Sequence, residues 1–448
     1  MLREGKGDSR IKVLFMAITR NPRQMANQLQ LASKLMQRRF TRLPFVAKCS
    51  MGLSLVLSAV IYGSIFLVLL GNHLKKESFL EMSKCPACYG TSACENAKNG
   101  KVWFVGWSKI RFLDYVNVNN IYYGTDSGGQ SLLVSKLGSD SKIASMEKAV
   151  CALAKEPEGC DVSRAAGRAF PPSGTKWMLK QITGMSTMTT CPSDRLLEMI
   201  IGKYHEKNDA ISISASERAQ LMTTLMVNQE PIVFQTFPKL EGWPFPGYMG
   251  ACGRFVMTES IGMPLNNFYS MPFKIRATLA LKLLGIARQF TENEGQYALY
   301  WTELSYSTFV VDETGNLLVS DGRHILVVDL WQIKRDKNPG WDEACYSNFD
   351  SCADSEQSCS LTIPDCLCSA HMADHNYYAV CRNILSSFAS HNGVSISLLH
   401  NIPSDVEELY HIRELADKCA RPNKPRQRQG VVEELVKVLK EFIGPQLT

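Results

Sequence analysis

A β-hairpin that ends in an acidic residue is the most constraining feature of the sequence. Two runs rich in β-branched and aliphatic residues, Phe309–Asp312 and Leu317–Ser320, flank the turn Glu313–Asn316, which contains a glycine. The second run leads directly into Asp321 and Gly322. We therefore predict a hairpin that presents the Asp321 carboxylate at its end.

The segments around this hairpin alternate between strand-like and helix-like patterns. Alternation and helical spacing predict the following order. A strand at Ser131–Leu137 precedes helices at Lys142–Ala154, Asp194–Tyr204 and Ser216–Gln229, a β-rich segment at Pro231–Phe237, a strand at Gly253–Thr258, a long amphipathic helix at Phe273–Asn293, the hairpin, and a helix that opens at Asp374. This order indicates an α+β fold.

An apolar run near the start of the chain predicts a membrane anchor. Residues 51–71 are almost wholly apolar, and no charged residue occurs between Cys49 and Leu74. About 20 such residues span a bilayer as a helix. Basic residues are more frequent before this run than after it, so the positive-inside rule predicts a cytosolic tail at 1–50 and a single transmembrane signal-anchor at 51–71. We therefore expect a single-pass type II protein with a lumenal C-terminal domain.

The positive charge of the chain is concentrated in that tail. The net charge is +6, and residues 1–48 hold eleven lysines or arginines against two acids. The simplest interpretation is a solvated basic tail, and a specific lipid or nucleic-acid site is the alternative. We predict no nucleic-acid partner.

The cysteines agree with an oxidising compartment. Of the 15 cysteines, 14 follow the apolar run, and an even number in a lumenal domain predicts a disulfide framework. We assign a structural role to Cys85, Cys88 and Cys94. Zinc is the alternative for this group and for the dense Cys345–Cys368 group, but no histidine occurs at zinc-finger spacing around the first group. A redox role for the Cys85-Pro86-Ala87-Cys88 motif would need a preceding strand and a following helix, and turn-like sequence flanks it instead.

A lysine on the predicted strand has a candidate partner on the next helix. The two-residue period places Leu132, Val134 and Lys136 on one face of the strand. Glu147 is the one carboxylate in the helix at Lys142–Ala154. We predict a Lys136–Glu147 ion pair, and two solvated surface residues are the alternative.

Five strings show which family the chain resembles. They are KCPACYGTSAC at 84–94, DRLLEMIIGKY at 194–204, EGWPFPGYMGACGRFV at 241–256, WTELSYSTFVVDETGNLLVSDGRHILVVDL at 301–330 and DHNYYAVCRNIL at 374–385. With them the chain closely resembles the divergent protein kinase domain family, in particular the deleted-in-autism proteins of the secretory pathway, from about Lys84 to Glu441. The resemblance implies a two-lobed protein-kinase-like fold, a Golgi or secretory location, and signalling roles after secretion for some relatives.

The resemblance also implies roles for individual residues. A kinase places a catalytic Asp and a metal-binding Asn before such a hairpin and a metal-binding Asp after it. Here those places hold Glu303, Thr308 and Asp321. Lys136 and Glu147 would contact the nucleotide, with ATP and Mg²⁺ or Mn²⁺ as cofactors. The helix-opening Asp374 would hold the catalytic-loop backbone from below, and a helix N-cap is its alternative role.

The replaced residues bear on activity. Glu303 adds a methylene to the expected catalytic carboxylate, and Thr308 offers the second metal a weaker ligand than an amide. Residues Gly124–Gly129 lack the spacing of a phosphate-binding glycine loop, so a hairpin turn is the favoured interpretation. The departures favour a pseudokinase or weak kinase that acts as a lumenal binding or signalling module with an unknown lumenal or extracellular protein partner. An active ATP- and metal-dependent protein kinase is the alternative, and a glycosyltransferase is disfavoured because the lumenal part has no Asp-x-Asp motif.

These inferences combine into one architecture. We predict a disulfide-rich α+β, two-lobed protein-kinase-like fold preceded by a single transmembrane helix. Its parts are the basic tail at 1–50, the anchor at 51–71, a Cys-rich cap with the first strands at 76–130, an N-lobe at 131–262 and a C-lobe at 263–448. The expected location is the Golgi or endoplasmic reticulum membrane, and proteolytic release would make the domain a secreted one.

Overall fold

The computed structural model describes residues 45–69, 73–109, 120–171, 185–204, 213–348, 365–391 and 394–444. The chain divides into two compact units, Met1–Gly71 and Asn72–Thr448. Most of the predicted basic tail, together with Cys352 and Cys359, lies outside the described residues.

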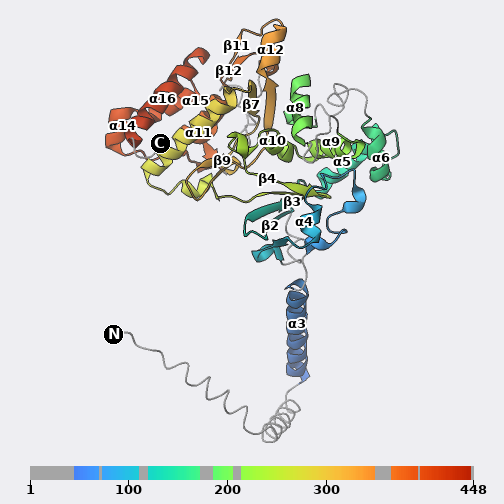
Figure 1. Cartoon of the computed structure of the whole chain (residues 1–448). Helices are drawn as coiled ribbons and strands as arrows, with labels where there is room; N and C mark the ends of the chain where they lie inside the picture. Colours follow the sequence, from blue (N-terminus) through green and yellow to red (C-terminus); the bar gives the residue numbers. More distant parts are fainter. Residues whose placement is uncertain are drawn as a thin grey trace, which may run out of the picture. The chain divides into compact units, whose positions relative to one another are not determined.

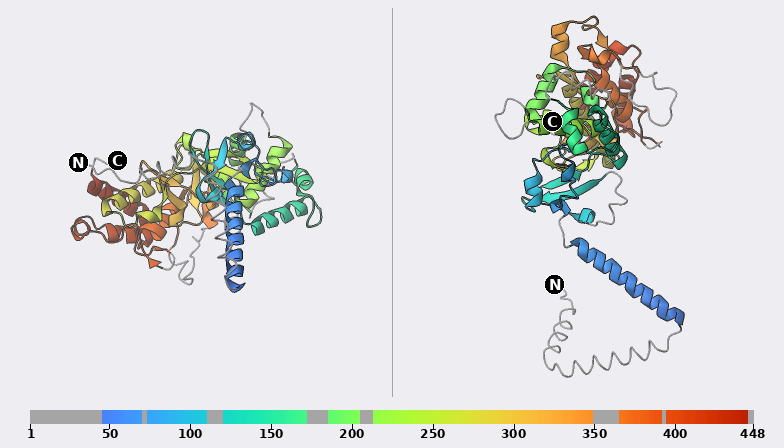
Figure 2. Two further views of the ribbon diagram at one scale, coloured as in Figure 1. Left: turned by 90° about the horizontal axis from the view of Figure 1, so that it is seen from below. Right: turned by 90° about the vertical axis from the view of Figure 1, so that its right-hand side faces the viewer.

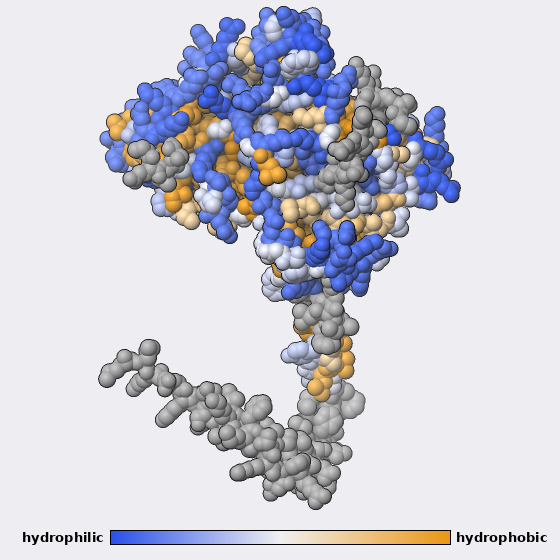
Figure 3. All heavy atoms as spheres, in the orientation of Figure 1, coloured by the Kyte–Doolittle hydropathy of each residue, from blue (hydrophilic) through white to orange (hydrophobic). Residues whose placement is uncertain are grey.

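The predicted transmembrane helix requires a correction. Helix α3 (Phe45–Leu69) occupies the apolar run (Figure 1), and its apolar side chains, such as Leu53 and Leu57, are exposed (Figure 3). Among the described residues, no helix is both long and apolar enough to cross a membrane. The structure therefore does not support the single transmembrane helix predicted at 51–71, nor the membrane anchoring that rested on it.

The second unit contains a five-stranded antiparallel sheet, which follows the short helix α4 (Cys94–Lys98). Its order is β1-β2-β3-β5-β4. The strands are β1 (Val102–Phe104), β2 (Ile121–Asp126), β3 (Ser131–Ser135), β4 (Tyr248–Cys252) and β5 (Phe255–Glu259). Leu132 and Val134 of β3 are buried and alternate with more exposed residues, as predicted. The Asp126 carboxylate accepts hydrogen bonds from the backbone of Gly128 and Gln130, so the glycine-rich segment forms a hairpin turn.

Helices fill the chain between β3 and β4. They are α5 (Asp140–Leu153), α6 (Val162–Ala169), α8 (Asp194–Tyr204), α9 (Ala215–Val227) and α10 (Glu230–Thr236). The last of these corrects the β-rich segment predicted at Pro231–Phe237. Pro231 stands in the first turn, where a helix tolerates a missing N–H, and the side chain of Asn228 accepts a hydrogen bond from the Glu230 N–H. The β-branched and aromatic residues that suggested strands are the buried positions of this helix.

The remaining elements build a helix-rich part around the predicted hairpin. Its strands are β6 (Met263–Pro264), β7 (Tyr297–Trp301), β8 (Phe309–Val311), β9 (Leu317–Val319), β10 (Ile325–Asp329), β11 (Ala344–Cys345), β12 (Met372–Ala373), β13 (Ser390–His391) and β14 (Val394–Ser395). Its helices are α11 (Phe273–Thr291), α12 (Leu330–Asp336), α13 (His375–Val380), α14 (Ser404–Tyr410), α15 (Ile412–Ala420) and α16 (Arg428–Ile443). Strands β8 and β9 pair in the antiparallel register that the sequence predicted. Helix α16 packs on α11 and α15, away from β1–β3 (Figures 1 and 2).

The disulfide framework is confirmed for the described cysteines. Every cysteine described from residue 73 onward is paired, in the bonds Cys85–Cys88, Cys94–Cys252, Cys151–Cys160, Cys191–Cys368, Cys345–Cys366 and Cys381–Cys419. Cys94–Cys252 joins the Cys-rich cap to β4. Within the described part of the chain, no cluster of three or more metal-ligating side chains occurs, so the zinc alternative gains no support there. The lobe boundary predicted after residue 262 stays a prediction.

The pairing itself can be tested chemically. We expect a proteolytic digest of the alkylated, unreduced chain to contain the linked peptides of Cys94–Cys252 and Cys191–Cys368, because these bonds join segments that pack together in the fold. Mass spectrometry detects them, and reduction before alkylation is the control. Alkylated Cys94 or Cys252 in the unreduced sample would contradict this pairing.

Candidate functional site

Lys136 and Glu147 do not form the predicted ion pair. Lys136 follows β3, and its Nζ lies 2.6 Å from Glu81 Oε1 and 3.5 Å from Asp140 Oδ1. Glu147 of α5 instead lies 2.6 Å from the Nη2 of Arg254 and 3.3 Å from the Nζ of Lys84. The structure thus gives each predicted partner a different counter-ion.

Arg254 is the centre of this charge network. Its side chain is 2% exposed, and a charge so deeply buried requires partners. Besides Glu147, its Nη1 lies 3.1 Å from Glu81 Oε2, and its Nε donates to the carbonyl of Ala87 at 3.2 Å. Burial acts to raise the pKa of Glu147, but the cations Arg254 and Lys84 lower it overall. Arg254 therefore fixes the Cys-rich cap to the sheet and keeps the Glu147 carboxylate ionised.

The turn that carries Arg254 has little freedom. Gly253 adopts a left-handed backbone conformation with φ of 61°. A side chain at this position would overlap the carbonyl oxygen of Leu80 in the cap. The Arg254 N–H donates to the same carbonyl at 2.9 Å, so the cap and the β4–β5 turn are in direct contact.

Asp321 is bound by a cation two residues further along the chain. Its Oδ1 accepts hydrogen bonds from the backbone N–H and the Nε of Arg323, both at 2.9 Å. Its Oδ2 lies 2.6 Å from Arg323 Nη2. Burial acts to raise the pKa of Asp321, and Arg323 outweighs it, so the pKa is lowered. The carboxylate predicted to hold a metal is thus closed by a bidentate guanidinium.

A second carboxylate, which we did not predict from the sequence, lies beside Asp321. Glu230 is the first residue of α10, and its Oε2 accepts a hydrogen bond from the Gly322 N–H at 3.2 Å. Burial and the charge of Asp321 raise the pKa of Glu230 to about 8. One acid of this pair is therefore ionised at neutral pH while the other carries a proton.

A close approach of the backbone explains why these two acids meet. A methyl group on Gly322 would lie 3.3 Å from the Cα of Glu230, so the glycine lets α10 pack against the end of the hairpin. The neighbouring Gln229 is buried, and its Nε2 donates to the carbonyls of Gly322 and Ile325 at 3.2 and 2.6 Å. In the sequence, Pro231 could have predicted this contact, because proline favours the first turn of a helix and here directly follows Glu230.

The structure places the predicted catalytic residue Glu303 and the predicted metal ligand Thr308 in different surroundings. Glu303 is 64% exposed, and His324 Nδ1 lies 3.5 Å from its carboxylate. Thr308 is buried, and its hydroxyl accepts a hydrogen bond from the Ser305 N–H at 3.1 Å within a reciprocal cap. Its hydroxyl therefore has a structural partner already. Glu303 still acts electrostatically on this region, because its charge contributes to the raised pKa of Arg323.

The residues after Asp374 hold the strand that leads to Glu303. His375 Nε2 donates to the Trp301 carbonyl at 2.8 Å, and Asn376 Oδ1 accepts from the Trp301 N–H at 3.3 Å. Burial lowers the pKa of His375 to about 4, so the imidazole is neutral and can accept a hydrogen bond from the Ser347 hydroxyl through Nδ1. His375 and Asn376 thus support the end of β7.

Asp374 has a different role from either one predicted. Its carboxylate accepts from the Ser347 N–H at 2.8 Å and forms a buried ion pair with Arg428 at the start of α16. It makes no side-chain capping bond to α13. Burial raises the pKa of Asp374, and the charge of Arg428 opposes that effect.

The charged groups predicted to handle phosphate belong to two networks. Asp321, Glu230, Arg323 and the Glu303 side chain act on one another, and Lys142 joins them, because burial and the charge of Arg323 lower its pKa. Lys136 belongs to the separate network of Arg254. Since Arg323 closes Asp321 and Glu81 holds Lys136, neither of the predicted phosphate-handling charges is free.

Comparisons with known proteins point to one family. Residues 222–422 match the family described as the protein-kinase domain of FAM69. The chain is 36% identical over 386 residues to human divergent protein kinase domain 2A, and the alignment covers 83% of this chain and 89% of that protein. It is 36% identical over 385 residues to the Xenopus tropicalis protein of the same name, with 83% and 89% covered.

A second relative and a solved structure complete the comparison. Human divergent protein kinase domain 2B is 30% identical over 305 residues, which cover 64% of this chain and 69% of that protein. The structure of the Rv3197–erythromycin complex from Mycobacterium tuberculosis aligns with a TM-score of 0.26 at 10% identity, covering 72% of this chain and 71% of that one. So low a TM-score carries no argument about this fold.

The buried Asp374–Arg428 pair should contribute strongly to stability. Asp374→Asn leaves the Arg428 charge, which is 1% exposed, without its counter-ion. We expect the free energy of unfolding to fall by about 3–5 kcal/mol, as for other broken buried pairs. Urea denaturation measures it, and Glu414→Gln is the control, because Glu414 pairs with Lys418 on the surface and its loss should change little. Equal effects of the two substitutions would contradict the assignment.

Glu230 should make stability fall as the pH rises. Its pKa is raised from an ordinary 4.5 to about 8, so between these values the folded chain holds a proton that the unfolded chain releases. The stabilisation is complete below about pH 4.5 and is lost as the pH rises through about 8. We expect the free energy of unfolding of the wild type, relative to Glu230→Gln, to decrease from about pH 5 to about pH 9 in urea denaturation. A constant difference would show that Glu230 has an ordinary pKa.

Proposed function

The chain belongs to the family of divergent protein kinase domain proteins, and we propose that it is a pseudokinase that acts as a binding or signalling module. In this proposal the kinase-like fold is a scaffold for recognition, and it does not transfer phosphate at a useful rate. Its partner would be a protein of the secretory lumen or the extracellular space.

One observation supports this proposal above all: the charges expected to handle phosphate are paired within the protein. Phosphoryl transfer depends on positioned cations and on metal-binding carboxylates that are free to meet the nucleotide. Asp321 is held by Arg323 through two side-chain contacts of 2.9 and 2.6 Å, and Lys136 lies 2.6 Å from Glu81. ATP would have to separate Lys136 from Glu81, and a metal would have to separate Asp321 from Arg323.

The disulfide bonds are the basis for the cellular compartment that we propose. The paired cysteines are consistent with a lumenal or secreted domain, because such bonds form and persist in oxidising compartments. We propose the Golgi or another part of the secretory pathway, as the family resemblance implies.

The alternative is an active ATP- and metal-dependent kinase, and the Glu230–Asp321 pair is the observation in its favour. Two adjacent carboxylates, completed by phosphate oxygens and water, are a ligand set that Mg²⁺ accepts. Arg323 would then have to leave Asp321 when the metal binds. The two proposals therefore differ in what happens to the Asp321–Arg323 contact.

Thermal unfolding with nucleotide separates them. We expect the full chain to show no shift in melting temperature with about 1 mM ATP and Mg²⁺ or Mn²⁺, whereas a ligand at 100 times its Kd would stabilise the folded state by about 2.7 kcal/mol. Arg323→Ala frees the Asp321 carboxylate, so this variant should gain a metal-dependent shift. The double variant Arg323→Ala, Asp321→Asn should show no such shift, which would identify Asp321 as the metal-binding group.

The contrary outcome is equally specific. A metal-dependent shift in the wild type that Asp321→Asn and Lys136→Met abolish would support the active kinase. Equal shifts in the wild type and in all variants would place the nucleotide elsewhere. Melting temperatures without ligand are the control for folding of each variant.

A further inference from the structure

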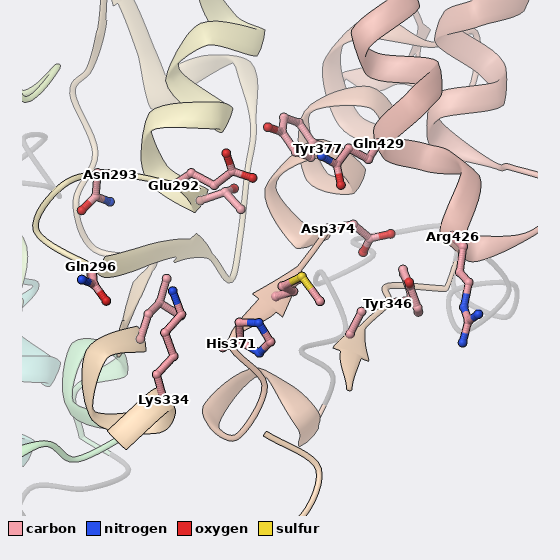
Figure 4. A pocket seen from close by; sticks show the side chains of 15 residues that line it. Glu292, Asn293, Gln296, Lys334, Tyr346, His371, Asp374, Tyr377, Arg426 and Gln429 are labelled. Carbon is pink, nitrogen blue, oxygen red and sulfur yellow. The ribbon is translucent and has the colours of Figure 1, made fainter. Parts of the chain in front are cut away.

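A preformed pocket lies in the helix-rich part, outside the network described above. Its volume is about 580 Å³, which is within the range of ligand sites in proteins. The end of α11, helix α12, the β11–β12 pair, α13 and the start of α16 surround it (Figure 4). Lys136, Glu230 and Asp321 are not among its lining residues, so a ligand there would not contact the residues predicted to handle phosphate.

Covalent and ionic contacts shape the wall of this pocket. Strand β11 pairs with β12, and Cys345 of β11 is bonded to Cys366, while the adjacent Cys368 is bonded to Cys191. Asp374, which also lines the pocket, is held by the buried Arg428. The wall therefore keeps its shape without a ligand, and a preorganised site loses less conformational entropy on binding.

The polar lining carries charges that lack partners. Neither Lys334 nor Arg426 has an ion-pair partner anywhere in the part of the chain that the structure describes, and the same holds for Glu292. In the view of Figure 4, Lys334 and Arg426 lie on opposite sides of His371. His371 Nδ1 donates to the Trp341 carbonyl at 2.6 Å, which leaves its Nε2 as a hydrogen-bond acceptor. The pocket thus presents two free cations, one free carboxylate and an oriented imidazole.

Apolar side chains occupy the space between these charges. Leu330, Tyr377 and Met372 line the pocket, and Met372 is 50% exposed. A flexible thioether at a pocket surface adapts to apolar groups of different shape. The ligand should therefore join an apolar group to an anionic one.

The hollow continues beyond this pocket, which favours an extended ligand. Two neighbouring hollows of about 480 and 550 Å³ share Glu292 with it and share Arg288 with each other. The first of these hollows lies between α11 and α16, and the second lies between α11 and Trp243. All three hollows meet at Glu292, and together they are called the groove below. A compact small molecule would fill one of these hollows, whereas an extended chain can occupy the series.

We propose that this groove binds an extended peptide segment with an acidic side chain next to an apolar one. Lys334 and Arg426, on opposite sides of His371, would each attract the negative charge of the peptide, Met372 and Leu330 would contact the apolar side chain, and Glu292 would accept hydrogen bonds from peptide N–H groups. Glu292 also disfavours densely charged polyanions, which would bring negative charge against it. The proposal names a surface for the protein partner of the proposed function and does not depend on whether the chain binds ATP.

A positional-scanning library of heptapeptides tests this on the full-length chain. We expect the wild type to enrich peptides that carry Asp or Glu beside Leu, Met or Phe. Lys334→Ala and Arg426→Ala should each weaken binding of the enriched peptides by about five- to tenfold, as expected for loss of one charge-assisted contact. Arg335→Ala is the matched control, because Arg335 lies on the same helix, pairs with Asp336 and does not line the pocket, so its binding should not change.

Several outcomes would overturn the proposal. No enrichment, or enrichment without a preference for acids, would rule out the assigned occupant. Equal binding by Lys334→Ala, Arg426→Ala and the wild type would place the peptide elsewhere. Complete competition by N-acetylphenylalanine would show that a small apolar carboxylic acid, and not a peptide segment, is the ligand. Circular dichroism of each variant separates loss of binding from loss of fold.

Discussion

The buried guanidinium of Arg254 determines how charge is distributed around the sheet. At 2% exposure this cation must be paired, and it takes Glu81 from the Cys-rich cap and Glu147 from α5. Lys136 then shares Glu81 with Arg254 and does not reach the helix carboxylate with which a kinase lysine would pair. Because Cys94–Cys252 joins the same two regions covalently, the cap is part of the charge network as well as of the disulfide framework.

At the end of the hairpin, charged side chains are also paired within the protein. Arg323 closes Asp321, and the neighbouring Glu230 responds to burial and to the Asp321 charge by retaining its proton. His375 and Asn376 bind the Trp301 backbone by hydrogen bonds of 2.8 and 3.3 Å, at the end of the strand that leads to Glu303. A kinase-like scaffold is thus retained while the groups that would act on phosphate bind each other. In our proposal, the groove that meets at Glu292 and includes Lys334 and Arg426 recognises the partner.

Local patterns in the sequence predicted the local structure well. The alternation of Phe309–Asp312 and Leu317–Ser320 predicted the β8–β9 hairpin, and helical spacing predicted α5, α8, α9 and α11. The pattern failed at α10, because a helix buried on all sides has the same β-branched and aromatic composition as a strand. Ion-pair partners were harder to predict, since Glu81 and Arg254 approach Lys136 and Glu147 only after the cap and the β4–β5 turn have packed. The predicted membrane anchor was also corrected, because no helix among the described residues is both long and apolar enough to cross a membrane.

A crystal structure of the full chain soaked with Mn²⁺ and a non-hydrolysable ATP analogue tests the central claim most directly. The claim is that Lys136 and Asp321, the charges predicted to handle phosphate, are paired within the protein. It predicts that Lys136 stays on Glu81 and Asp321 stays on Arg323, with no metal at the Asp321 carboxylate. Density for Mn²⁺ between Asp321 and Glu230, with Lys136 moved to the phosphates, would contradict it.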